Sequence, residues 1–178
     1  MKEVQIKNKV FEEYIDEKAI AQAVKEVAAK INRDYRGKDV IFLGVLNGAF
    51  MFASDLLKKI ELSCEISFIK VASYSGTTSS GVVHELIGLV TELHNKHVII
   101  VEDIVDTGLT LDKIYSMIDH DEPLSVEVAT AFFKPSAYEG SHPPKYRGIE
   151  IENEFVVGYG LDYEGYGRNN SSIFKLKQ

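Results

Sequence analysis

The sequence has one cysteine, Cys64, so no internal disulfide bond is possible. It has no run of 18 apolar residues and no apolar segment near its start, which predicts neither a membrane-spanning helix nor a signal peptide. Lysine and arginine form no stripe, and the net charge of −7 argues against nucleic acid or an anionic membrane as partner. We therefore expect a cytoplasmic protein with a small-molecule partner. Cys64 lies in a strand-like run and is expected to be a small buried apolar residue.

The motifs of several enzyme classes are absent as well. The pair Gly158-x-Gly160 lacks the third glycine and the following helix pattern of a dinucleotide site, and no GxxxxGK[ST] segment occurs. No serine lies in a G-x-S-x-G turn. His94 and His97 have no cysteine or third histidine at zinc spacing, so we expect both at the surface beside the start of a strand. These absences disfavour a kinase or another NTPase.

The apolar pattern predicts one α/β domain over residues 1–178. An apolar strand, a glycine turn and a helix follow one another twice, over residues 40–60 and 98–118. Such units indicate a doubly wound, mainly parallel sheet flanked by helices, with its turns gathered along one edge. The other predicted elements are a helix over 16–35 capped by Asp16, strands over 65–72 and 125–133, an edge strand with a connection over 1–13, a hairpin arm over 82–90 and an irregular connection over 136–147.

Residues 98–111 combine a buried strand with a polar turn. The β-branched run 98–101 suits a strand covered on both faces, and Glu102 and Asp103 follow where that strand is expected to end. Ligands of open α/β sheets bind beyond the carboxyl ends of the strands. The turn Asp106-Thr107-Gly108-Leu109-Thr110 leads into a helix, whose free N–H groups and dipole favour an anion.

Three carboxylates beside an anion site repel the anion unless a cation or sugar hydroxyls lie between them. The pattern therefore indicates a phosphorylated sugar bound with Mg²⁺. The alternative is that Glu102, Asp103 and Asp106 are ordinary loop acids and Thr107 is a helix cap.

This stretch resembles the phosphoribosyl-pyrophosphate (PRPP) motif of the type I phosphoribosyltransferases, two acids at a strand end and then Asp-Thr-Gly-x-Thr. From about Val40 to Arg168 the order and spacing of the segments are similar to the hypoxanthine-guanine phosphoribosyltransferase family of purine salvage. The resemblance implies the type I fold with a small hood region from the chain ends. It also implies transfer of the 5-phosphoribosyl group from PRPP to N9 of hypoxanthine or guanine with Mg²⁺ as cofactor, and a homodimer or homotetramer.

The resemblance assigns roles to the residues that match the family's motifs. Asp106 would be the catalytic base at the purine N7. The ribose phosphate would be bound by Glu102, Asp103, Asp106, Thr107, Gly108, Leu109 and Thr110. Pyrophosphate would be bound by Asn47, Gly48 and Arg168. The purine would contact Lys134 through its 6-oxo group, the ring of Phe155, the backbone of Val156, and Asp162. The metal would be bound by Glu102, Asp103 and Asp162.

The polar loop 73–81 is either a solvated connection or a lid. Ser73 and Tyr74 are similar to the flexible catalytic loop of the family, which favours the lid. Asn47 and Leu109 stand where some relatives have lysine, so phosphate and pyrophosphate contacts at these positions are expected from the backbone. A lysine at a strand end, such as Lys134, is more often a solvated charge than a ligand, but Lys134 is expected at the same sheet edge as the turns of Asp103 and Asn47, which favours a ligand.

Two other functions remain open at this point. A regulator of pyrimidine-operon type has a similar fold and PRPP motif and binds RNA, which requires a basic face. A xanthine-guanine or adenine salvage enzyme would differ only in its base pocket. The three donors of the Lys134 ammonium favour a 6-oxopurine over adenine.

Overall fold

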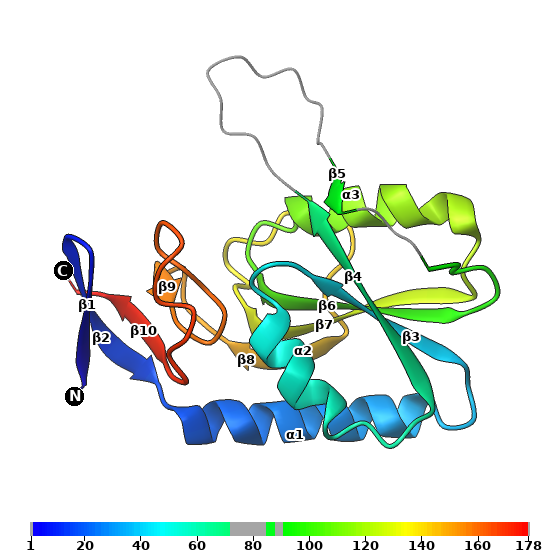
Figure 1. The fold of residues 1–178 in the computed structure, drawn as a ribbon, viewed down its shortest axis with the longest axis horizontal. Helices are drawn as coiled ribbons and strands as arrows, with labels where there is room; N and C mark the ends of the chain where they lie inside the picture. Colours follow the sequence, from blue (N-terminus) through cyan, green and yellow to red (C-terminus); the bar gives the residue numbers. More distant parts are fainter. Residues whose placement is uncertain (1, 72–84, 88–90, 178) are drawn as a thin grey trace, which may run out of the picture.

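The computed structural model describes residues 2–71, 85–87 and 91–177 (Figure 1). The predicted lid residues Ser73 and Tyr74 lie outside the described residues. The main sheet has the strand order β5-β4-β3-β6-β7-β8, in which β5 pairs antiparallel to β4 and all other neighbours are parallel. Its strands are β3 (Val40–Val45), β4 (Cys64–Val71), β5 (Glu85–Ile87), β6 (His97–Val105), β7 (Ser125–Phe133) and β8 (Tyr146–Glu150).

Helices cover both faces of this sheet, which confirms the predicted doubly wound class. In Figure 1, α1 (Glu17–Asp34) and α2 (Phe50–Leu57) lie below the sheet, and α3 (Leu109–Ile118) lies above it. One apolar core includes residues of α1 and α2, and a second includes the buried side of α3. The predicted cap is confirmed, since the Asp16 carboxylate accepts a hydrogen bond of 2.8 Å from the Ala19 N–H. A 3₁₀ turn, η1 (Asp119–Asp121), follows α3.

The acids of the central strand lie inside it rather than after it. We predicted that the strand ends near Val101, but β6 continues to Val105, so Glu102 and Asp103 are strand residues. The reason is one-sided pairing. The pairing of β6 with β3 ends at Val101, whereas its pairing with β7 continues through Val105 beside Phe133. The last part of β6 therefore borders an open edge that admits polar side chains.

The two ends of the described chain meet in a second, antiparallel sheet with the order β1-β2-β10-β9. Its strands are β1 (Glu3–Ile6), β2 (Lys9–Ile15), β9 (Val156–Val157) and β10 (Ile173–Leu176), and they lie at the left of Figure 1. This sheet is the hood region that the resemblance implied. The expected single edge strand over residues 1–13 is instead a hairpin, because Val4 pairs with Phe11 and both pack in the hood core.

Three expectations about surface residues were wrong. Cys64 is exposed rather than buried, and Ile66 and Phe68 on the same face of β4 are exposed as well, so this face of the strand is uncovered. His97 is partly buried, with its ring nitrogen Nδ1 2.8 Å from the Ser125 hydroxyl. Basic residues do cluster in space: α1 and residues 59–62 form a cavity of about 600 Å³ lined by Lys25, Arg33, Arg36 and Lys59, together with Glu61. Among the described residues, no helix has both the length and the apolar character to cross a membrane.

Candidate active site

A cavity of about 520 Å³ opens at the carboxyl ends of β3, β4 and β6. Such an edge is where ligands of open α/β sheets bind. Its lining includes many of the predicted site residues, namely Gly48, Glu102, Asp103, Asp106, Thr107, Gly108, Thr110 and Asp162. The other lining residues are Val45, Leu46, Val71, Ile104, Val105 and Leu111.

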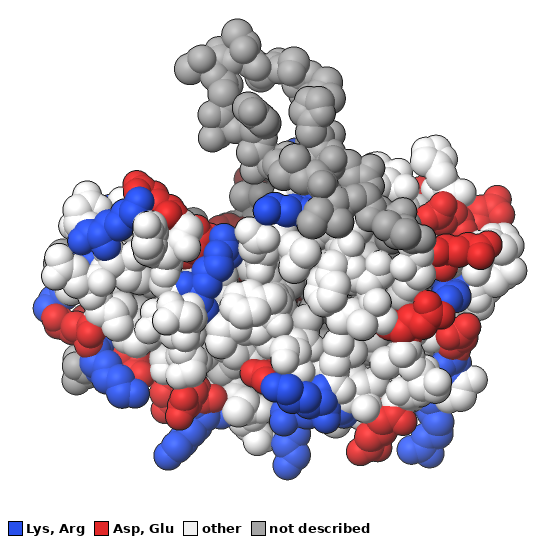
Figure 2. Space-filling model, in the orientation of Figure 1, with Lys and Arg blue, Asp and Glu red and all other residues white. Residues whose placement is uncertain are grey.

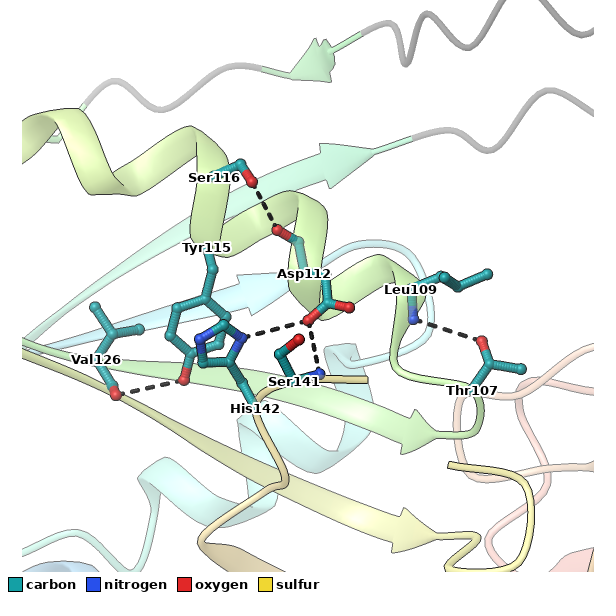
Figure 3. A network of polar contacts seen from close by, with 8 residues as sticks. All are labelled: Thr107, Leu109, Asp112, Tyr115, Ser116, Val126, Ser141 and His142. Carbon is teal, nitrogen blue, oxygen red and sulfur yellow. Dashed lines mark hydrogen bonds and ion pairs between the residues drawn. The ribbon is translucent and has the colours of Figure 1, made fainter. Parts of the chain in front are cut away.

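The turn between β6 and α3 has the geometry of an anion site. Gly108 is the N-cap of α3 and has a left-handed φ of 88°, which favours glycine. Gly108 has no side chain to cap the helix, and Gly108, Thr110 and Leu111 line the cavity at this helix start. The nearest side-chain acceptor, the Thr107 hydroxyl, lies 3.5 Å from the Leu109 nitrogen, at the limit of a hydrogen bond (Figure 3).

Two neighbouring carboxyls line the other wall. Glu102 is buried, and this burial, together with the charge of Asp103, raises its pKa well above the usual range. Burial raises the pKa of Asp103 to about 6, although the Ile104 N–H donates to its Oδ1 at 2.9 Å and opposes the rise. These carboxyls are held in a poorly hydrated place where bound cations and hydroxyl donors are favoured.

Gly48 makes room for the Asp103 carboxyl. A Cβ at position 48 would lie 1.6 Å from Asp103 Oδ2, so only glycine fits between the two segments. Gly160 in turn packs on Gly48, since a Cβ there would lie 2.0 Å from the Gly48 carbonyl oxygen. The turn after β3 is thus enclosed on two sides, by an acid from β6 and by the backbone after β9.

Asp106 and Lys134 form an ion pair. Lys134 follows β7 directly, and its backbone N–H donates to the Val105 carbonyl at 3.0 Å, which fixes it beside the end of β6. Its ammonium donates to Asp106 Oδ2 at 2.8 Å and, more weakly, to Asn153 Oδ1 at 3.5 Å. The lysine side chain is only 8% exposed, which makes a solvated surface charge untenable. Asn153 is a contact that sequence reasoning missed.

Arg168 and Asp162 form a second pair, 2.6 Å between Nη2 and Oδ1. Arg168 also donates to the Gly160 carbonyl at 2.7 Å, and Asp162 accepts from the Gly165 N–H at 2.6 Å. Both charges act on Asp103, whose pKa is lowered by Arg168 and raised by Asp162. The three side chains therefore belong to one electrostatic cluster.

The other predicted residues lie outside the cavity lining. Phe155, next to β9, is 48% exposed and has its ring 6.0 Å from that of Tyr163, edge to face. Val156 is buried, and its position in β9 pairs with Lys175. Asn47, on the turn after β3, and Leu109, the first residue of α3, are exposed. The cavity with its turn thus brings together the predicted phosphate and acid residues, whereas the predicted stacking residue lies on the hood.

The doubly wound sheet with its hood matches the type I phosphoribosyltransferase fold. Residues 11–164 match the family model described as phosphoribosyl transferase domain, and the chain belongs to this family. This confirms the resemblance seen in the sequence.

Named relatives agree along nearly the whole chain. The hypoxanthine-guanine phosphoribosyltransferase of Staphylococcus aureus is 40% identical over 171 residues, which cover 96% of each chain. That of Streptococcus pneumoniae is 37% identical over 174 residues, 97% of each chain. A crystal structure of the S. aureus hypoxanthine phosphoribosyltransferase superposes with a TM-score of 0.88 at 40% identity, and covers 93% of this chain and 91% of that one.

Proposed function

We propose that this protein transfers the 5-phosphoribosyl group of PRPP to N9 of hypoxanthine, and of guanine, and releases pyrophosphate. The observation that carries the proposal is the ion pair between the buried Lys134 and the partly exposed Asp106, next to the turn before α3. This pair would offer a proton acceptor and a hydrogen-bond donor beside the proposed phosphate site. The names of the relatives support the same substrates.

The turn after β6 would bind the 5′-phosphate. Its backbone N–H groups and the hydroxyls of Thr107 and Thr110 are suitable donors, and the α3 dipole adds to their effect. Glu102 and Asp103 would face the ribose hydroxyls. Breaking the bond between C1 and the pyrophosphate oxygen develops positive charge on the ribose, which these carboxyl groups would stabilise.

Asp106 and Lys134 would contact different atoms of the purine base. In the free site they neutralise each other. The 6-oxo group of the purine can accept a hydrogen bond from the Lys134 ammonium. This bond would replace the one to Asp106, so that Asp106 can take the proton from N7 as N9 attacks C1. The 6-amino group of adenine is another donor, so the same lysine would lose a partner in a buried place. Phe155 would supply a ring for stacking and Val156 a backbone contact to the base edge.

Mg²⁺ is expected with the substrate rather than in a preformed cage. Among the described residues, no three His, Cys, Asp or Glu side chains are grouped as a metal site. The available donors are carboxyl oxygens of Glu102, Asp103 and Asp162, which suit Mg²⁺, an ion usually held by one or two carboxylates and substrate phosphates. When bound, Mg²⁺ neutralises the departing pyrophosphate. Arg168 would add a fixed charge there, and the backbone around Asn47 and Gly48 would add N–H donors.

The proposal is tested by mixing the protein with PRPP, Mg²⁺ and hypoxanthine and separating the products by chromatography. Inosine 5′-monophosphate and pyrophosphate are expected in equal amounts. Absence of both products, with the folded state checked by circular dichroism, would overturn the proposal.

The basic cavity on α1 supports one alternative, an RNA-binding regulator. Lys25, Arg33, Arg36 and Lys59 lie together there, away from the sheet edge that carries the acids. Filter binding with single-stranded RNA at low and high salt measures the RNA affinity that this alternative requires. The enzymatic proposal predicts weak binding that is lost in salt, and tight binding without phosphoribosyl transfer would favour the regulator.

We also propose that the protein forms a homodimer through α2 and β4. The side chains of Phe50, Ile66 and Phe68 are exposed by 44%, 44% and 37%, and the Phe68 ring lies over Gly44 of β3. Figure 2 shows few charged side chains over these elements, and such an apolar patch on a rigid face is typical of an interface between copies.

Sedimentation tests the dimer. Phe68→Asp should give a monomer, because a charge in a closed apolar interface has no partner. Leu124→Asp, which places the same charge at a side chain 59% exposed on another surface, is the control and should sediment as the wild type does. A wild-type monomer at micromolar concentration would contradict the proposal.

A further inference from the structure

The segment 138–142 lies against the turn that is proposed to bind phosphate. The Glu139 N–H donates to the Thr107 carbonyl at 3.0 Å. Gly140 packs on Gly108 so closely that a Cβ on Gly108 would lie 2.9 Å from the Gly140 Cα and 2.6 Å from the Tyr138 ring. This segment, which we call the brace, fixes the outer side of the turn.

The brace also engages Asp112 in the first turn of α3 (Figure 3). Asp112 Oδ1 accepts from the Ser141 N–H at 3.2 Å and lies 3.3 Å from His142 Nδ1. The His142 ring stacks on Tyr115, with 3.8 Å between centroids and 16° between planes. The Tyr115 hydroxyl donates to the Val126 carbonyl at 3.4 Å, which anchors this stack to β7. His142 is therefore held in place while it faces the carboxylate.

The contact has an electrostatic consequence for the turn. A carboxylate in the first turn of a helix is attracted to the same N–H groups that bind an anionic ligand. If Asp112 were free, it could compete for these groups or repel a phosphate at them. Its Oδ1 is instead occupied by Ser141 and His142, on the side of the helix that faces the brace.

We infer that His142 is a positioning residue for the phosphate turn, acting through Asp112 and the brace. It keeps the Asp112 carboxylate away from the anion site and holds the turn in its binding shape before the ligand arrives. This inference rests on the proposed function, since it assigns PRPP as the anion. Removing the His142 side chain should weaken PRPP binding and leave the chemical step largely intact, because His142 is not one of the residues that line the cavity and takes no part in the Asp106–Lys134 ion pair.

His142→Phe tests this directly, because phenylalanine keeps a ring for Tyr115 and loses the donor to Asp112. The KM for PRPP should rise roughly 5- to 20-fold, with kcat changed less than about threefold, as expected for one hydrogen bond to a charged group. The Kd for PRPP with Mg²⁺, measured by calorimetry, should rise by the same factor. His120→Phe, at an exposed histidine of η1, is the matched control and should leave both constants unchanged.

A second variant separates charge from structure. Asp112→Asn keeps an oxygen for the Ser141 N–H and removes the negative charge. In the His142→Phe background it should restore the KM for PRPP to within about threefold of wild type, because no carboxylate is left to compete. Wild-type KM in His142→Phe, or a double variant that is worse than either single one, would overturn the inference. If the wild-type protein itself forms no product from PRPP, the proposed function fails first, and the two failures are thereby distinguished.

Discussion

The two strand–turn–helix units of the main sheet share one layout but differ in what surrounds their turns. The turn after β3 is enclosed, with Gly48 between the Asp103 carboxyl and the backbone at Gly160. The turn after β6 is open toward the cavity and supported from outside by the brace, with Gly108 as an uncapped helix start. The two turns therefore have different roles. The open turn offers N–H donors to an anion, whereas the enclosed turn holds a carboxyl in position.

The largest effect should come from Asp106, which follows the strand that carries the open turn. Asp106→Asn preserves volume and removes the proton acceptor, so kcat should fall by about 10² to 10⁴. The Kd for PRPP should change little, since the backbone of the turn is kept. Single-turnover kinetics, which isolate the chemical step, measure the first quantity and calorimetry the second. Wild-type turnover in this variant would reduce Asp106 to a turn residue.

Replacing Lys134 should impair the use of the purine base but leave PRPP binding at the open turn nearly unchanged. Lys134→Ala removes the donor to the 6-oxo group and leaves Asp106 without its 2.8 Å partner. We expect kcat/KM for hypoxanthine to fall by roughly 100-fold, as for the loss of a buried charged partner. The KM for PRPP should stay within about threefold. Steady-state kinetics with each substrate varied in turn provide the check, and an equal loss for both substrates would contradict the separation of the two roles.

The glycines distinguish the two turns most directly. Gly108→Ala strains a residue at φ 88° and pushes on Tyr138 and Gly140, so PRPP binding should weaken by roughly 10- to 100-fold. Gly37→Ala is the matched control. Its φ of 73° carries similar backbone strain, but nothing lies within 4 Å of a Cβ, so only stability should fall, by about 1 kcal/mol.

Gly48→Ala should behave differently, because its Cβ would meet a side chain rather than backbone. Its loss of stability should be largely relieved by Asp103→Ala in the same protein, since the overlapping atoms belong to Asp103. Urea denaturation of the two single variants and the double variant gives the coupling. Simple additivity would show that the enclosed turn is not held by this contact.

The pH dependence of stability gives a smaller effect at the same contact. Burial raises the pKa of Asp103 from the usual value near 4 to about 6, so the folded state binds this proton more tightly than the unfolded chain does. Stability is therefore lost as pH rises from about 4 through 6. Asp103→Asn should remove this loss and stabilise the protein at pH 8 by up to about 3 kcal/mol, with no gain at pH 4.

Urea denaturation at the two pH values measures the difference. Asp119→Asn, at an exposed carboxylate in η1, is the control and should show no such pH-dependent gain. A gain for Asp103→Asn that is equal at pH 4 and pH 8 would assign the effect to packing rather than to ionisation.

Local patterns in the sequence predicted much of the fold. The strand β7 was predicted with its observed bounds, and α1 with its Asp16 cap, because each depends on neighbouring residues. The open turn was predicted for the same reason, since strand, acids, glycine and helix follow one another directly. The fold of the hood came from the family resemblance.

What sequence missed depends on distant partners. The extension of β6 through Asp103 follows from β7 pairing where β3 no longer does. The contact of Gly108 with Gly140 joins residues more than 30 positions apart, and no local pattern marks it. The exposure of Cys64 likewise reflects an uncovered face of β4 and not the apolar character of its neighbours. The lid assigned to Ser73 and Tyr74 stays a prediction, since both lie outside the described residues.

The central claim is that the buried Lys134, paired with Asp106 beside the phosphate turn, selects a 6-oxopurine. The most direct test is the ratio of kcat/KM for hypoxanthine to that for adenine in the wild-type protein, with PRPP and Mg²⁺ saturating. Since a site built around one hydrogen bond rejects a mismatched partner strongly, we expect a ratio on the order of 10⁴. A ratio within tenfold of unity would contradict the account.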